Sequence, residues 1–275
     1  MTLGRLLREG KSVLLAAGVE DWEADAWYLL EYAAGCSRKD YFLNPEKEAD
    51  EADEARYREL LRKRSRHVPL QHLTGSQDFM GCSFLVNEDV LIPRQDTEVL
   101  VEEALRHIRP GMKILDLCTG SGCILLSILK LIPGVSGVGT DISGRALLVA
   151  ERNRTALGIE AEFRQSDLFE RVEGSFDCIL SNPPYISTGV IDTLAEEVRG
   201  HEPRLALDGR EDGLYFYRKI TAAGPRHLKP GGMLFLEIGY DQAEPVVGMM
   251  NERFADIHIV KDLSGLDRVV YGHLR

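Results

Sequence analysis

The sequence predicts an α/β fold with a doubly wound, mostly parallel sheet, preceded by a small all-helical N-terminal domain and a β-hairpin linker. Three observations carry this expectation. Strand-like and helix-like segments alternate from residue 113 onward, residues 1–67 show only helical spacing of apolar residues, and short extended runs lie between these two parts. Because ligands of such sheets bind at the carboxyl ends of the strands, we expect the functional residues there.

The composition is that of an ordinary soluble globular protein. Of the 275 residues, 44% are hydrophobic and 28% are charged, which allows a packed core. The net charge of −11 disfavours a surface that coats nucleic acid, so no stable nucleic-acid binding is expected. The five cysteines form no CxxC pair, and we expect neither a metal site nor disulfides. No export signal or membrane span is visible, and a monomeric, cytoplasmic protein is the expectation.

The first part of the chain predicts helices. Thr2 and Asp21 are expected to cap two amphipathic helices, because apolar residues follow each of them at helical spacing. Residues 46–54 include six acids among nine, and residues 56–67 include six lysines or arginines. This charge pattern fits a helix pair or one long helix. Its basic part is either a solvated face with i,i+4 ion pairs or a docking surface for a macromolecular partner.

The middle of the chain predicts a linker. Pro69 is expected to end the helical stretch, and glycine turns then join three extended runs at residues 70–73, 82–86 and 90–92. These signals divide the chain into a helical domain at 1–74, a β-hairpin linker at 75–92 and a sheet domain at 93–275.

The last domain begins with a helix at 96–108, after which strands and helices alternate. Strands are expected at 113–117, 137–141, 161–164, 176–181, 233–238, 257–261 and 268–273. Helices are expected at 122–131, 144–157, 214–227 and 242–251.

An acid and a glycine turn follow the first strand of this sheet. Asp116 lies in that strand, the turn at 118–122 follows, and Asp141 ends the next strand, 25 residues after Asp116. A glycine turn lets a ligand approach the backbone, and a carboxylate can accept hydrogen bonds from both ribose hydroxyls. The dinucleotide fingerprint needs Gly or Ala where this chain has Leu125, so NAD is not expected. The pattern looks like the S-adenosylmethionine site of class I (Rossmann-like) methyltransferases, with a turn that serves packing alone as the alternative.

The most informative string, Asn182-Pro183-Pro184-Tyr185, stands at the end of the fourth strand. It resembles the (Asn/Asp)-Pro-Pro-(Tyr/Phe/Trp) motif of enzymes that methylate planar, weakly basic nitrogens. Such a nitrogen has a delocalised lone pair and attacks a sulfonium methyl group poorly unless it is oriented. The Asn182 oxygen and the Pro183 carbonyl can accept its two N–H groups, the prolines stiffen the loop, and Tyr185 offers a flat wall. A proline-rich turn that only ends a strand is the structural alternative.

Over essentially its whole length the chain resembles the PrmC/HemK family, the peptide chain release factor N5-glutamine methyltransferases. Besides the two loops, the resemblance rests on PLQHLTG at 69–75, IPRQDTE at 92–98 and EP at 202–203. It implies a helical domain that helps engage the release factor, a hairpin linker and a methyltransferase domain. It also implies the reaction: a methyl group passes from S-adenosylmethionine to the glutamine of the GGQ motif in the release factor, a protein of translation termination. The product of the cofactor is S-adenosylhomocysteine.

The resemblance implies the site residues as well. Asn182, Pro183, Pro184 and Tyr185 would hold the glutamine amide. The cofactor would be bound by Asp116, Cys118, Thr119, Gly120, Ser121, Gly122, Asp141, Ile142, Asp167, Leu168 and Asn182.

Two residues depart from the family pattern: Cys118 stands where the family usually has Gly, and Gln95 where it usually has Pro. Because a side chain at positive φ costs about 1–2 kcal/mol, an ordinary φ is expected at Cys118. Gln95 puts the stiffness of its segment in doubt, not the activity. Arg94 and Glu98 either serve the site or form an ion pair at a helix start. The His201-Glu202 pair is likewise open between a simple turn and a site contact.

Two other functions stay open. A DNA or RNA adenine-N6 methyltransferase would use the same Asn-Pro-Pro-Tyr loop, with the basic run at 56–66 against phosphates, although the net charge opposes this. A non-catalytic module would bind the methyl donor as a signal or not bind it at all. Methylation of a release factor and not of nucleic acid would separate these hypotheses from the first.

Overall fold

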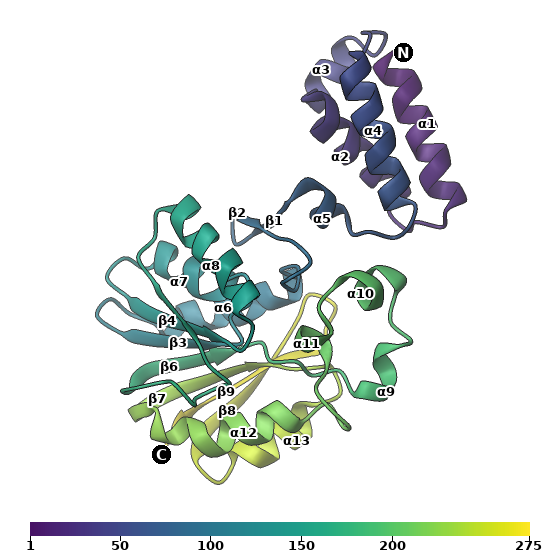
Figure 1. Ribbon diagram of the computed structural model, residues 1–275. Helices are drawn as coiled ribbons and strands as arrows, with labels where there is room; N and C mark the ends of the chain where they lie inside the picture. Colours follow the sequence, from purple (N-terminus) through teal and green to yellow (C-terminus); the bar gives the residue numbers. More distant parts are fainter. The chain divides into compact units, whose positions relative to one another are not determined.

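The computed structural model describes residues 1–275, and the chain divides into two units (Figure 1). The helical unit comprises Met1–Gly75 and Ala195–His201. The sheet unit comprises Ser76–Leu194 and Glu202–Arg275. A short segment from the second half of the chain thus belongs to the helical unit, which no local sequence pattern predicted.

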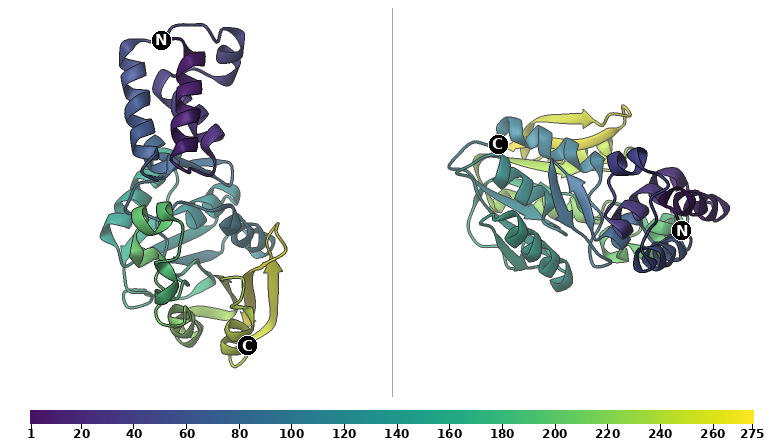
Figure 2. Two further views of the ribbon diagram at one scale, coloured as in Figure 1. Left: turned by 90° about the vertical axis from the view of Figure 1, so that its right-hand side faces the viewer. Right: turned by 90° about the horizontal axis from the view of Figure 1, so that it is seen from above.

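Three helices of the helical unit pack side by side: α1 (Leu3–Ala16), α2 (Trp22–Ala34) and α4 (Glu51–Arg64) (Figure 2). Their buried leucines and Tyr57 form its core, and the Tyr57 hydroxyl donates a hydrogen bond of 3.0 Å to the Ala26 carbonyl. Gly10 permits this packing, since a Cβ there would lie 1.9 Å from the Tyr57 oxygen. The unit is completed by the short helices α3 (Arg38–Leu43), α5 (Leu70–Thr74) and α10 (Glu196–His201).

The basic run of the sequence lies on the helix α4 up to Arg64, and half of its six basic residues, Arg58, Lys63 and Arg64, form ion pairs. Lys63 pairs with Glu59 at 2.9 Å, one turn earlier on the same helix. Arg64 is buried and pairs with Asp25 of α2 at 2.6 Å and with Glu197 of α10 at 2.8 Å. The Lys63 pair is of the expected i,i+4 type, while Arg64 joins three helices; a docking role of the remaining basic residues stays a hypothesis.

The expectation of an extended run at 70–73 is wrong, because these residues lie in the helix α5. Pro69 precedes the helix with an extended backbone, and its carbonyl accepts a hydrogen bond from the Leu73 amide, so this proline starts a helix instead of only ending one. Gly75, with φ of +80°, ends it. The run expected at 90–92 forms no strand either. The hairpin itself consists of β1 (Ser76–Phe79) and β2 (Cys82–Leu85).

The sheet unit confirms the predicted fold class. Its seven strands are arranged in the order β5-β4-β3-β6-β7-β9-β8. The first five are parallel, and β9 runs antiparallel to both of its neighbours at the edge that is yellow in Figure 2. The strands are β3 (Lys113–Leu117), β4 (Ser136–Asp141), β5 (Glu162–Gln165), β6 (Phe176–Ser181), β7 (Leu228–Glu237), β8 (Phe254–Lys261) and β9 (Asp267–Leu274).

Helices cover both faces of this sheet (Figure 1). One face carries α6 (Gln95–His107), α7 (Cys123–Leu131) and α8 (Gly144–Leu157); the other carries α12 (Tyr215–Ala223) and α13 (Ala243–Met250). A separate apolar core fills each side. The helix expected at 214–227 stops at Ala223 and continues as the 3-10 turn Gly224–Arg226, because Pro225 has no amide hydrogen to donate.

The short helices α9 (Thr188–Ile191) and α11 (Arg204–Leu207) complete the fold. No helix combines the length and the apolarity that crossing a bilayer would require.

Candidate active site

The register of the parallel strands brings their carboxyl ends to one level. Leu117 of β3 lies opposite Thr140 of β4 and Ser181 of β6, and Ser181 in turn lies opposite Leu236 of β7. The residues that follow these positions therefore stand along one edge of the sheet. The glycine turn, the acid that ends β4 and the Asn-Pro-Pro-Tyr loop all belong to this row, which is where a doubly wound sheet binds its ligands.

The loop after β3 is held from both sides. The Thr119 amide donates to the Thr140 carbonyl at 2.9 Å, and the Thr119 hydroxyl donates to the carboxylate of Asp116 at 2.5 Å. Further along, the Gly120 amide donates to Asp141 at 3.0 Å, and the Ser143 amide donates to the other oxygen of Asp141 at 2.9 Å. The two acids therefore fix the loop: Asp116 from β3, which precedes it, and Asp141 from the neighbouring strand β4.

Cys118 contradicts the expectation of an ordinary φ, since its φ is +58°. The cause is tertiary: Thr119 is anchored to β4 by its amide and to β3 by its hydroxyl, so the residue before it has to make the turn. Leu168, after β5, also has a positive φ of +48°. Both residues line the cleft at this edge, and backbone strain of about 1–2 kcal/mol tends to be stored at such sites. Burial raises the pKa of the Cys118 thiol, which therefore stays uncharged.

A cleft opens at the sheet edge, and most of the expected cofactor residues line it. Asp116 and Gly122 lie outside this lining, and their expected role in cofactor binding stays a prediction. Asp116 is fully buried beneath the loop, and Gly122 caps α7, where a Cβ would lie 3.0 Å from the ring of Phe163. The expected residues that line the cleft are Cys118, Thr119, Gly120, Ser121, Asp141, Ile142, Asp167, Leu168 and Asn182.

This lining fits S-adenosylmethionine. Each Asp141 oxygen accepts one backbone hydrogen bond and keeps a lone pair for a ribose hydroxyl. Ile142, which directly follows Asp141 and is 48% exposed, and Leu168, which follows β5, both present apolar surface to the cleft, as a flat base requires. Gly120 has open space where a Cβ would stand, so a ligand can approach the backbone there. The acids of this edge also favour a cationic sulfonium group.

The Asn-Pro-Pro-Tyr loop contributes Asn182 and Pro184 to the lining, while Pro183 is buried and Tyr185 is half-buried. The ring of Tyr185 packs against the core under α12 and α13 and is not part of the lining, which differs from the flat wall that was expected. Burial raises the pKa of its phenol, which stays neutral. The loop thus presents the Asn182 amide to the cleft and anchors itself through Tyr185.

Gln242 holds this loop and was not found from the sequence. Its side-chain amide nitrogen donates to the Tyr185 carbonyl at 2.9 Å, and its oxygen accepts from the Gly239 amide at 2.9 Å and from the Tyr217 hydroxyl at 3.3 Å. The only sequence signal was a polar residue just before a helix, which usually indicates a cap. The end of β7, the start of α13 and α12 are thereby tied to the backbone of the Asn-Pro-Pro-Tyr loop.

Asn153 of α8 has a comparable role at the cofactor loop. It is fully buried, and its amide nitrogen donates to the carbonyls of Ser121 at 2.9 Å and Leu85 at 3.0 Å. Its oxygen accepts from the Leu85 amide at 2.6 Å. One side chain therefore joins the hairpin to the turn that lines the cleft, a contact that no local pattern indicates.

Arg94 and Glu98 do not pair with each other. Arg94 forms an ion pair with Glu202, whose side chain is buried, and Glu98 accepts a hydrogen bond of 2.6 Å from the Met80 amide in the hairpin turn. Arg94 and Glu98 therefore do not form the ion pair that was considered for the start of the helix. Glu202 is likewise more than part of a simple turn, because it pairs with Arg94. The Arg94–Glu202 pair joins the segment before α6 to the segment that returns after α10, and the next residue, Pro203, lines the cleft.

Asp116 makes the stability of the fold depend on pH. Burial raises its pKa from 3.8 to about 7, so ionisation costs free energy in the folded state. The folding stability that this group contributes is complete below about pH 4 and is lost as the pH rises to about 7. Asp116→Asn is expected to be more stable than the unchanged protein by about 2–4 kcal/mol at pH 8, and by little at pH 4. Urea unfolding at both pH values measures this, and a difference that is the same at both would contradict the assignment.

Comparison with known proteins gives a consistent result. The family model described as the PrmC N-terminal domain matches residues 5–75, and the one described as the methyltransferase small domain matches residues 95–210. The release factor glutamine methyltransferase of Geobacter sulfurreducens is 41% identical over 275 residues, covering 99% of this chain and 97% of the relative. That of Caulobacter vibrioides is 42% identical over 278 residues, covering 99% and 96%.

Among solved structures, a methyltransferase from Pyrococcus furiosus has the same fold. It superposes with a TM-score of 0.52 and 17% identity, covering 69% of this chain and 87% of that one. At this identity the likeness concerns the fold alone.

Proposed function

Because the chain belongs to the family of release factor glutamine methyltransferases, we propose that it transfers a methyl group from S-adenosylmethionine to the N5 amide nitrogen of the glutamine in the GGQ motif of a peptide chain release factor. The observation that carries this proposal is the place of Asn182: it follows β6 directly and lines the same cleft as the loop after β3. An amide-orienting group and a cofactor loop thus share one cleft.

The chemistry follows from the weakness of the nucleophile. The nitrogen of a carboxamide shares its lone pair with the carbonyl, so the amide has to be held with that nitrogen facing the methyl group. The Asn182 oxygen and the Pro183 carbonyl would accept its two N–H groups. The ring of each proline fixes φ, and Gln242 holds the Tyr185 carbonyl, so the acceptors do not have to be ordered when the substrate arrives. No strong base is needed, because the proton can leave to water after the transfer.

The cofactor supplies a methyl group on a positively charged sulfur. Asp141 would hold its ribose, Ile142 and Leu168 would pack against its base, and the backbone of residues 118–121 would follow its chain. Asp116 and Gly122 would act through this loop and not by contact.

The helical domain, residues 1–74, would help engage the release factor, the linker at 75–92 would connect it, and the domain at 93–275 would carry the catalysis. The proposal includes a monomer that acts in the cytoplasm. The net charge of −11 argues against the adenine-N6 alternative, and Lys63 and Arg64 of the basic run have carboxylate partners.

One assay tests the reaction class. The protein is incubated with labelled S-adenosylmethionine and, in parallel, with a release factor, with a release factor whose GGQ glutamine is changed to alanine, and with adenine-containing DNA and RNA. Label is expected only in the unchanged release factor. Label in nucleic acid alone, or in no substrate, would overturn the proposal.

A further inference from the structure

Two buried polar side chains lie behind the amide of Asn182. Thr97, near the start of α6, is 2% exposed, and Glu237, the last residue of β7, is 1% exposed. The Asn182 side-chain nitrogen donates a hydrogen bond of 3.2 Å to the Thr97 hydroxyl oxygen. Thr97 lines the cleft and Glu237 does not. The proposed mechanism has so far used neither residue.

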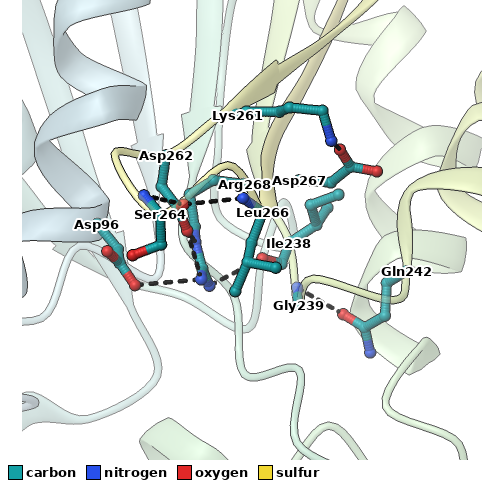
Figure 3. A network of polar contacts seen from close by, with 10 residues as sticks. All are labelled: Asp96, Ile238, Gly239, Gln242, Lys261, Asp262, Ser264, Leu266, Asp267 and Arg268. Atoms are coloured by element: carbon teal, nitrogen blue, oxygen red, sulfur yellow. Dashed lines mark hydrogen bonds and ion pairs between the residues drawn. The ribbon is translucent and has the colours of Figure 1, made fainter.

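A buried arginine stands next to this group. The turn between β8 and β9 is built on Asp262, one oxygen of which accepts from the amides of Ser264 at 2.9 Å and Leu266 at 3.0 Å (Figure 3). The other oxygen accepts from the guanidinium of Arg268 at 2.9 Å. Asp262 thereby fixes the orientation of the Arg268 guanidinium.

Arg268 joins the two segments that carry Thr97 and Glu237. Its guanidinium pairs with Asp96 at 3.1 Å and donates to the Ile238 carbonyl at 3.4 Å, two contacts seen together in Figure 3. Asp96 precedes Thr97, and Ile238 follows Glu237. The start of α6 and the end of β7 are therefore clamped at the positions next to the two polar side chains.

The donor and acceptor groups of Glu237, Thr97 and Asn182 allow only one order of hydrogen bonds among these three side chains. A carboxylate only accepts hydrogen bonds, a hydroxyl can donate one while it accepts another, and an amide has a donor end and an acceptor end. Burial raises the pKa of Glu237 to about 7, and hydrogen bonding from Thr97 and Asn182 opposes the rise, so both side chains face this group, which is a carboxylate above about pH 7. When the Thr97 proton points to Glu237, its oxygen accepts from the nitrogen of Asn182. The oxygen of Asn182 is then left toward the cleft.

We propose that Thr97 and Glu237 are positioning residues that hold the Asn182 amide with its oxygen toward the substrate. The opposite orientation would set an NH₂ group against the N–H groups of the glutamine amide, two donors facing each other. This inference rests on the proposed function and extends it to two residues that act through Asn182.

Thr97→Val and Thr97→Ser test the proposal because a packing role and a positioning role predict opposite orders. Valine keeps the volume and removes the hydroxyl, while serine keeps the hydroxyl and removes a methyl group. We expect Thr97→Val to lower kcat about tenfold and Thr97→Ser to retain most of it, with the cofactor Kd of both within about twofold of the unchanged protein. If serine is the more impaired variant, or if valine has full kcat, the proposal is wrong.

Glu237→Gln is a second variant that does not depend on the first. Glutamine has the same size and removes a buried charge, so folding stability is expected to be kept, as thermal unfolding would show. Because glutamine can also donate, the direction of the hydrogen bonds is lost, and at pH 8, where Glu237 is ionised, kcat is expected to fall about tenfold at unchanged cofactor Kd. An unchanged kcat would overturn the inference while the enzyme still methylates the release factor. Absence of methylation by the unchanged protein would instead overturn the proposed function.

Discussion

Asn182→Ala is expected to lower kcat for release factor methylation by about 100-fold or more and to change the Kd of S-adenosylmethionine by less than about threefold. In the proposed mechanism the side chain supplies one of the two acceptors that orient the substrate amide, and alanine would leave the amide nitrogen free to rotate away from the methyl group. The cofactor would keep its other proposed contacts, namely the loop after β3 and Asp141, which line the cleft. Single-turnover kinetics and calorimetric titration with the cofactor measure the two quantities separately.

Asp141→Ala is the comparison for this variant and should show the reverse pattern. Removing a carboxylate that is expected to accept from the ribose hydroxyls, and that also holds the Gly120 amide, should raise the cofactor Kd about tenfold or more. At saturating cofactor, kcat should be much less affected than in Asn182→Ala. Equal loss of cofactor affinity in both variants would contradict the division of roles between the two loops.

Gly209→Ala is expected to lower kcat between about 10- and 100-fold, although residue 209 is outside the lining of the cleft. A Cβ there would lie 2.8 Å from the Cα and the carbonyl carbon of Tyr185 and 2.8 Å from the Cα of Gly213. All three are backbone atoms that cannot rotate away, and the Gly209 amide also donates to the Ile186 carbonyl at 2.8 Å. The substitution therefore has to displace the end of the Asn-Pro-Pro-Tyr loop.

Gly189→Ala is the matched control. Gly189 lies in α9, a few residues beyond the same loop, and a Cβ there would meet no atom within 4 Å. Its kcat and melting temperature should stay close to those of the unchanged protein. Unchanged kcat in Gly209→Ala, with the melting temperature also unchanged, would show that the backbone of Tyr185 is not a constrained part of the site.

The features of this protein that the sequence predicted are those in which neighbouring residues carry the signal. Alternating strands and helices placed the sheet, and the boundaries of β3 and α8 agree with the expectation to the residue. The parallel order then implied that the glycine turn and the Asn-Pro-Pro-Tyr loop meet at one edge, as the register shows. The wrong expectation at 70–73 arose because a proline followed by a short apolar run is typical of both a helix start and a strand.

What the sequence by itself determined is therefore the fold class, the edge of the sheet that carries the site and the type of chemistry there, because periodicity and turn composition act over a few residues. The tertiary structure alone decided which distant polar atoms meet. Gln242 reaches the Tyr185 carbonyl, Thr97 reaches Asn182 across 85 positions, and Cys118 takes a positive φ because of an anchor on another strand. Such contacts depend on strand register and on buried hydrogen-bond satisfaction, and neither of these leaves a periodic signal in the chain.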